Sequence, residues 1–123
     1  MNKKVKAKWL EALRSGEYKQ TTSTLMNPTT NGYCCLGVLC DLYAKEVGGS
    51  FDSDGFFRDK KGNMGDGTPP DDVIKWAEMR DENPSVSGKY SKMVDNEDNI
   101  SIAELNDEGK RFKTIANIIE KEL

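Results

Sequence analysis

The chain has 123 residues, of which 36% are hydrophobic and 32% charged, and its formal net charge is −3. This length predicts one domain, spanning residues 1–123, with one core, and the small net charge creates no global field that would attract nucleic acid or a membrane. No apolar run approaches the roughly 20 residues of a membrane span and none follows the basic start as in a secretory signal, so we expect a cytoplasmic protein without a membrane partner.

The first predicted element is an amphipathic helix over residues 3–14. Val5, Trp9 and Leu13 recur at four-residue steps, which places them on one helical face. Gly16 favours the end of this helix, because glycine readily adopts the left-handed conformation that follows a last turn. The lysines of its first turns form either a solvated face or a basic rim for an anionic ligand.

A short strand is predicted next, because residues 17–24 alternate weakly in polarity and are rich in Thr and Tyr. A cluster of turn-forming residues follows at 27–32. We expect this cluster to lead into a second helix, and Asn31 to cap that helix through its side-chain oxygen.

The second helix is predicted to be the buried centre of the fold. It runs from about Cys34 to Val47 and is apolar on most of its surface, so other elements must surround it. Gly37 within it costs about 1 kcal/mol of helix propensity relative to alanine, which a close approach by another backbone would explain. Gly48 and Gly49 then supply the stop.

The segment after the central helix is expected to contain short strands and loops. Extended chain is predicted from Ser50, followed by a hairpin that turns at residues 59–62. Pro69-Pro70-Asp71-Asp72 opens a short helix, because proline is tolerated in a first turn and carboxylates complement the helix dipole. Residues 80–99 are expected to be irregular, with one short strand near Val86 or at Met93-Val94.

The last segment is predicted to form two helices. Ser101 and Glu104 match a capping box, so a short helix begins there and ends at Gly109. An apolar stripe that begins at Phe112 predicts a closing helix. Together these elements predict an α+β fold with about four helices around a central buried helix and a short antiparallel sheet or hairpin.

Composition limits the chemistry of the chain. It has no histidine, which excludes Ser-His-Asp and Cys-His catalytic groups and every metal site that needs histidine. Three cysteines are too few for an all-cysteine zinc site, and we expect no metal and no cofactor. The thiols are expected to be buried hydrophobes, although Cys34 or Cys35 at a helix N-terminus has the setting of an activated nucleophile.

A DNA-binding role is not expected. Residues 102–119 imitate the first two helices of a helix-turn-helix, but only four residues follow, too few for a recognition helix. The acidic balance also lacks the basic footprint of a DNA-binding protein.

A ligand-binding site is the remaining hypothesis. Polar and aromatic residues stand at the predicted element ends, where they can converge around the N-terminus of the central helix, whose amide groups suit a phosphate or carboxylate. No catalytic residue is assigned. The candidate ligand-binding residues are Arg14, Tyr18, Gln20, Asn31, Asn106, Asp107, Lys110 and Arg111.

Three stretches resemble one family of small uncharacterised proteins encoded by phages, prophages and bacteria. The first is the run Cys-Cys-Leu-Gly-Val-Leu-Cys-Asp-Leu-Tyr at residues 34–43. The second comprises Ala-Glu-Leu-Asn-Asp-Glu-Gly at 103–109 and Phe-Lys-Thr-Ile-Ala at 112–116, and the third is the start at 9–20. The resemblance brings no established catalytic residue.

A phage setting implies an accessory, anti-defence protein that binds and sequesters a small anionic nucleotide-derived signal, such as those of Thoeris- or CBASS-type systems, without catalysis. Arg14, Gln20, Lys110 and Arg111 would supply hydrogen bonds and charge, and Tyr18 would stack on a base. One alternative is a protein–protein inhibitor that acts through the acidic loop within residues 80–99, and another is a cysteine-dependent enzyme. A homo-oligomer is also compatible with the sequence.

Overall fold

A computed structural model describes residues 1–65, 67–87, 89–90 and 100–123 of the chain. Within these ranges, the helices are α1 (Lys3–Ser15), α2 (Cys35–Glu46), α3 (Asp71–Ala77), α4 (Ile102–Asp107) and α5 (Phe112–Glu122). The strands are β1 (Met26–Asn27), β2 (Gly32–Tyr33), β3 (Ser50–Phe51), β4 (Phe57–Arg58), β5 (Met64–Gly65), β6 (Ser85–Val86) and β7 (Ile100–Ser101). The α+β fold class predicted from the sequence is confirmed.

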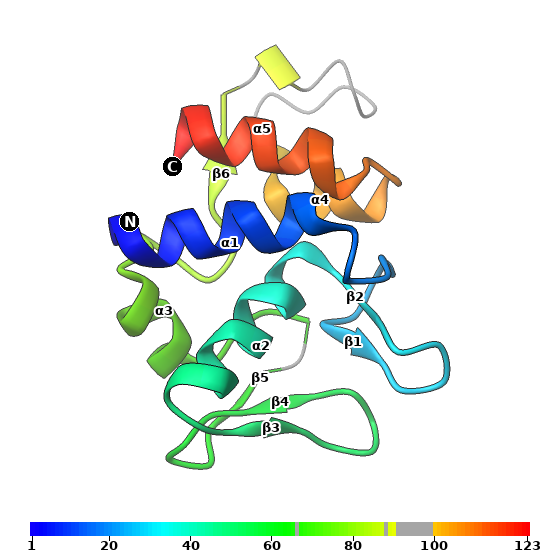
Figure 1. Ribbon diagram of the computed structural model, residues 1–123, viewed down its shortest axis with the longest axis vertical. Coiled ribbons are helices and arrows are strands. Elements are labelled where there is room, and N and C mark those ends of the chain that lie inside the picture. Colours follow the sequence, from blue (N-terminus) through cyan, green and yellow to red (C-terminus); the bar gives the residue numbers. More distant parts are fainter. Residues whose placement is uncertain (66, 88, 91–99) are drawn as a thin grey trace.

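Helix α2 lies at the centre of the fold. Helices α1, α3 and α4 all contact it, and α1 lies between α2 and α5 in Figure 1. Every residue from Cys35 to Cys40 is buried, and so is Tyr43. The expectation of a surrounded central helix is therefore confirmed, and its cause is the apolar sequence on nearly every side of α2.

A close backbone contact explains the glycine inside α2. A Cβ atom added to Gly37 would lie 1.8 Å from the carbonyl oxygen of Leu25. The same carbonyl accepts a hydrogen bond from the backbone N–H of Cys34 at 3.1 Å. The segment before β1 therefore passes directly against the first turn of α2, and only glycine leaves room for it.

Helices α1 and α5 pack side by side in antiparallel directions (Figure 1). Helix α1 buries Val5, Trp9, Leu10 and Leu13, close to the stripe read from the sequence. Trp9 is fully buried, and its indole Nε1 donates to the carbonyl oxygen of Cys35 at 2.9 Å. This bond ties α1 to the start of α2 and satisfies a donor that burial would otherwise leave unpaired.

All paired strands in the described residues are antiparallel and two residues long. Strand β1 pairs with β2, β4 lies between β3 and β5, and β6 pairs with β7. The predicted hairpin turn at 59–62 is confirmed: Asp59 Oδ1 accepts from the backbone N–H groups of Lys61 and Asn63, both at 2.9 Å. Figure 1 shows β3 and β4 at the end of the molecule opposite α5.

The strand predicted over residues 17–24 is wrong. This segment forms only an isolated parallel bridge between Gln20 and Tyr33. Ser23 has a φ of +67°, which interrupts an extended chain. Hydrogen bonds to distant residues hold the segment instead, as when the backbone N–H of Thr21 donates to the carbonyl of Tyr33 at 2.9 Å.

The predicted cap of α2 is also wrong. Asn31 is exposed in the turn between β1 and β2, with a φ of +58°, and two strand residues separate it from the helix. Cys34 is the N-cap, and its Sγ accepts from the backbone N–H of Gly37 at 3.3 Å. Asn31 occupies the left-handed conformation that asparagine tolerates better than most residues.

Other predictions for the second half of the chain are confirmed. Strand β6 includes Val86, and the capping box of α4 joins Ser101 and Glu104 in both directions. The alternative strand at Met93-Val94 and the acidic run at 95–99 lie outside the described residues. Among the helices that are described, none has the length and apolar character required to cross a membrane.

Candidate functional site

Three of the predicted binding residues, Gln20, Asn106 and Lys110, meet where α1 ends and α5 begins. Gln20 Nε2 donates to the carbonyl oxygen of Lys110 at 2.6 Å and to Oδ1 of Asn106 at 3.0 Å. Gln20 Oε1 accepts from the backbone N–H of Phe112 at 3.2 Å, which satisfies one of the free donors at the start of α5. The amide of Gln20 is therefore engaged by the protein itself and fixes the position of this helix end.

Asn106 connects α4 to the start of α2. Its side chain is fully buried, and its Oδ1 accepts from the backbone N–H of Cys35 at 3.1 Å. Its Nδ2 donates to the carbonyl oxygen of Thr21 at 2.8 Å. The sequence predicted an anion at the N-terminus of the central helix, but Asn106 accepts the hydrogen bond of an N–H group there. Asn106 is buried and does not line the pocket described next.

A pocket of about 400 Å³ lies against the first turn of α5, and we call it the basic pocket. Its lining residues are Leu13, Gly16, Tyr18, Gln20, Arg111, Phe112 and Lys113. Two of these residues are cationic and none is acidic. The N-terminal end of the α5 dipole adds further positive potential. This arrangement favours an anion.

Tyr18 forms an aromatic wall of the basic pocket. Its hydroxyl donates to Asp41 and accepts from Nζ of Lys45 at 3.2 Å. Its ring packs edge-on against Tyr33, with centroids 5.2 Å apart. Burial, together with the hydrogen bond to Asp41, raises the pKa of Tyr18 to about 12, so the phenol is neutral near pH 7. These contacts fix the ring before any ligand binds.

Arg14 does not line the basic pocket. Its guanidinium donates to Oδ1 of Asn117 at 2.9 Å and forms an ion pair with Glu120 at 3.3 Å. It therefore fastens α1 to α5 on the surface. Its charge is largely compensated there, and the sequence pattern gave no sign of this partner.

The remaining predicted residues do not line the basic pocket. Asp107 Oδ1 accepts from the backbone N–H of Ser23 at 2.8 Å, which holds the irregular segment before β1. Lys110 contributes its carbonyl oxygen to Gln20. Asn31 stands in the β1–β2 turn. The structure thus gathers Tyr18, Gln20 and Arg111 at one pocket. Asn106 and Lys110 bond to Gln20 beside it, and the other predicted residues lie outside its lining.

Sequence reasoning missed Lys113 and Phe112 as pocket residues. The apolar stripe of α5 predicts Phe112 as a core residue. As the first residue of the helix, it also borders the pocket at the helix end. Lys113 follows Arg111 by two positions, and a pair of cations at a helix start runs against the dipole. This unfavourable placement of two cations at the start of a helix was the feature of the sequence that could have indicated an anion site.

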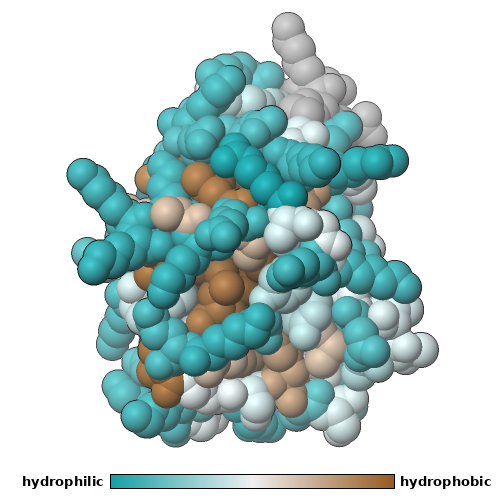
Figure 2. Space-filling view, in the orientation of Figure 1, coloured by the Kyte–Doolittle hydropathy of each residue, from teal (hydrophilic) through white to brown (hydrophobic). Residues whose placement is uncertain are grey.

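A second pocket of about 240 Å³, the side pocket, lies between α1 and α2. Its lining residues are Lys8, Glu11, Ala12, Ser15, Glu17, Tyr18, Leu42 and Lys45. Figure 2 shows apolar surface between these helices, bordered by hydrophilic side chains. The two lysines form ion pairs with Glu46 and Asp41.

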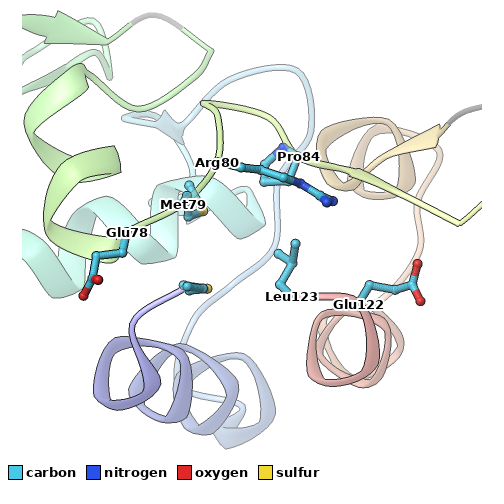
Figure 3. A pocket seen from close by; sticks show the side chains of 7 residues that line it. Glu78, Met79, Arg80, Pro84, Glu122 and Leu123 are labelled. Atoms are coloured by element: carbon cyan, nitrogen blue, oxygen red, sulfur yellow. The ribbon is translucent and has the colours of Figure 1, made fainter.

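A third pocket of about 210 Å³ lies between the start of α1, the end of α5 and the segment after α3. Figure 3 shows Glu78 and Glu122 directed away from it on opposite sides. Both carboxylates accept hydrogen bonds, from Asn2 at 2.7 Å and from the backbone N–H of Ser87 at 2.6 Å. None of the predicted binding residues lines this pocket.

A family model described as "Domain of unknown function (DUF8296)" matches residues 1–123, the whole length given. The chain belongs to this family. Comparisons with curated proteins and with solved structures gave no match. The description of the DUF8296 family leaves its function open.

The cysteines of the DUF8296 chain are buried and free. Burial raises the pKa of the Cys34 thiol to about 11, and raises those of Cys35 and Cys40 well above their usual range. A nucleophilic cysteine needs a lowered pKa and access to its substrate. Buried thiols with raised pKa values therefore give no support to a cysteine-dependent enzyme.

Proposed function

We propose that the DUF8296 chain binds a small anionic, nucleotide-derived ligand in the basic pocket without turning it over. The observation that carries this proposal is the lining of the pocket, in which Arg111 and Lys113 stand beside the fixed ring of Tyr18 with no carboxylate among them. Its volume of about 400 Å³ lies in the range of small-molecule sites.

The charged side of the pocket suits a phosphate. Among the described residues, neither Arg111 nor Lys113 forms an ion pair, so both cations remain available to a ligand. A guanidinium offers paired donors that match two phosphate oxygens, and an ammonium adds a mobile point charge. The α5 dipole acts in the same direction.

The aromatic side of the pocket suits a base. Stacking of a nucleobase on an aromatic side chain contributes about 1–3 kcal/mol. Because Asp41, Lys45 and Tyr33 already hold the ring of Tyr18, little conformational entropy is lost when a base stacks on it. Charge and stacking together select a nucleotide over a simple anion.

The sequestering role follows from the resemblance to phage-encoded proteins. Binding without turnover agrees with a chain that has no histidine and keeps its thiols buried. An anti-defence protein that removes a nucleotide signal needs only affinity. The acidic-loop alternative concerns residues that lie partly outside the described chain, and it stays a prediction.

The test is isothermal titration with adenosine 5′-monophosphate, ADP-ribose and a panel of cyclic nucleotides. For any ligand that binds, the double variant Arg111→Ala/Lys113→Ala should lower the affinity at least about tenfold, which corresponds to about 1.4 kcal/mol. The matched control is Lys75→Ala/Lys121→Ala, which removes two exposed helix lysines elsewhere and should leave affinity unchanged. Absence of heat with every nucleotide, or equal loss in both variants, would contradict the proposal.

A further inference from the structure

The basic pocket and the side pocket meet at one side chain. Tyr18 lines both, and it is the one residue that their linings share. Its hydroxyl end is held by α2 through Asp41 and Lys45. The two pockets are therefore adjacent at Tyr18, close enough for one extended molecule to contact both linings.

The two pockets carry opposite free charges. In the side pocket, Lys8 and Lys45 are neutralised by Glu46 and Asp41. Among the described residues, no hydrogen bond or ion pair engages the carboxylates of Glu11 and Glu17. The unpaired charged groups of the side pocket are therefore hydrogen-bond acceptors. In the basic pocket the free groups are the cations Arg111 and Lys113. A ligand that spans both must be anionic at one end and donate hydrogen bonds further along.

The floor of the side pocket adds a third requirement. Ala12 and Leu42 contribute apolar surface between the charged side chains of α1 and α2. A flat apolar group can cover this surface while one of its faces stacks on the ring of Tyr18. A purely inorganic polyphosphate offers no such group, and its charges would be repelled by Glu11 and Glu17.

Resting on the proposed function, we infer that the two pockets form one site for a ribonucleoside 5′-phosphate. The phosphate binds Arg111 and Lys113, the vicinal hydroxyls of the ribose donate to Glu17, and the base lies in the side pocket between the ring of Tyr18 and Leu42. Carboxylates accept from ribose hydroxyls in dinucleotide-binding folds by the same chemistry. Glu17 is thus the residue that distinguishes ribose from deoxyribose.

The experiment compares adenosine 5′-monophosphate with its 2′-deoxy analogue by isothermal titration. The unmodified chain should bind the ribonucleotide about tenfold more tightly, because the analogue leaves one carboxylate bond unmade. Glu17→Gln should reduce that ratio to about two or less, while Arg111→Ala/Lys113→Ala should weaken both ligands alike. Glu108→Gln, an exposed control, should keep the tenfold ratio.

The outcomes separate the inference from the function on which it rests. Equal affinity for both nucleotides, with loss of both in Arg111→Ala/Lys113→Ala, overturns the two-pocket site and leaves anion binding in place. A ratio that persists in Glu17→Gln overturns the role of Glu17. Failure of both nucleotides to bind the unmodified chain overturns the proposed function and the inference together. Thermal unfolding of Glu17→Gln should match the unmodified chain, because Glu17 is exposed.

Discussion

Gly37 shows how a single residue fixes the position of the segment that carries Tyr18 and Gln20. The carbonyl of Leu25 occupies the space that a Cβ at Gly37 would need. The chain before β1 is thereby held against α2, and Cys34 completes the contact through its N–H. A helix propensity scale counts this glycine as a cost, whereas the packed structure requires it.

Replacing Gly37 with alanine should destabilise the protein by about 3 kcal/mol, because either the helix or the Leu25 segment must move to remove the overlap. Urea-induced unfolding measures the change. The control is Gly62→Ala, where a Cβ would meet no atom within 4 Å and only the left-handed conformation is strained, at a cost of about 1–2 kcal/mol. A smaller loss at position 37 than at position 62 would contradict the packing described.

Tyr18 should make stability depend on pH in the alkaline range. Its pKa is raised in the folded state to about 12, so its stabilising contribution is complete below its usual pKa of about 10 and is lost as the pH rises toward 12. Unfolding measured near pH 9 and near pH 11 should show a smaller loss in Tyr18→Phe than in the unmodified chain. Groups common to both proteins cancel in this comparison. An identical loss in the two would show that burial and Asp41 do not raise the pKa of Tyr18 in the folded state.

Three elements meet at Asn106. This buried amide joins α4 to the backbone of Cys35 at the start of α2, to Thr21 and to Gln20. Gln20 in turn reaches the first residue of α5. A chain of side-chain amides therefore sets the relative position of two helix N-termini, and the basic pocket depends on that position.

Asn106→Ala should cost about 2–4 kcal/mol of stability, because it leaves the N–H of Cys35 and the carbonyl of Thr21 without their partner and removes one of two acceptors of the Gln20 amide. The matched control is Asn117→Ala. Within the described part of the chain the exposed side chain of Asn117 bonds only Arg14, and its loss should cost about 0.5 kcal/mol or less. Chemical denaturation of both variants measures the difference. Comparable losses would mean that the amide chain does not support the fold.

The sequence was informative where an element depends on its own residues. Helix α3 begins after Pro69-Pro70, α4 begins at the capping box, and the apolar face of α2 identified the core, because caps and periodicity act within a few residues. The strand prediction for residues 17–24 was wrong because this segment depends on distant residues. Its hydrogen bonds run to Tyr33, Asn106 and Asp107, which no local pattern encodes.

The candidate site was predictable only in part, because local patterns locate the ends of elements but not their distant partners. Tyr18, Gln20 and Arg111 lie at one pocket, but at the start of α5 and not at the N-terminus of α2, where the sequence predicted the element ends to converge. Their roles were not readable, because Gln20 and Asn106 bond to each other across 86 positions of sequence instead of facing solvent. Lys113 became visible only once α5 was placed beside the end of α1.

At the scale of the whole molecule, charge is segregated in a way that the net value hides. Residues 1–16 and 110–123 carry nine basic and three acidic side chains, whereas the rest of the chain carries nine basic and eighteen acidic ones. Packing of α1 against α5 brings the basic ends together (Figure 1). An acidic chain thereby acquires a positive side, and the basic pocket lies in it.

The most direct test of the central claim is an NMR titration of isotope-labelled protein with adenosine 5′-monophosphate. The account predicts saturable shifts that are largest at the backbone amides of residues 16–20 and 111–113, which border the basic pocket. Shifts that cluster instead around Met79 and Leu123, or an unchanged spectrum at saturating nucleotide, would contradict it.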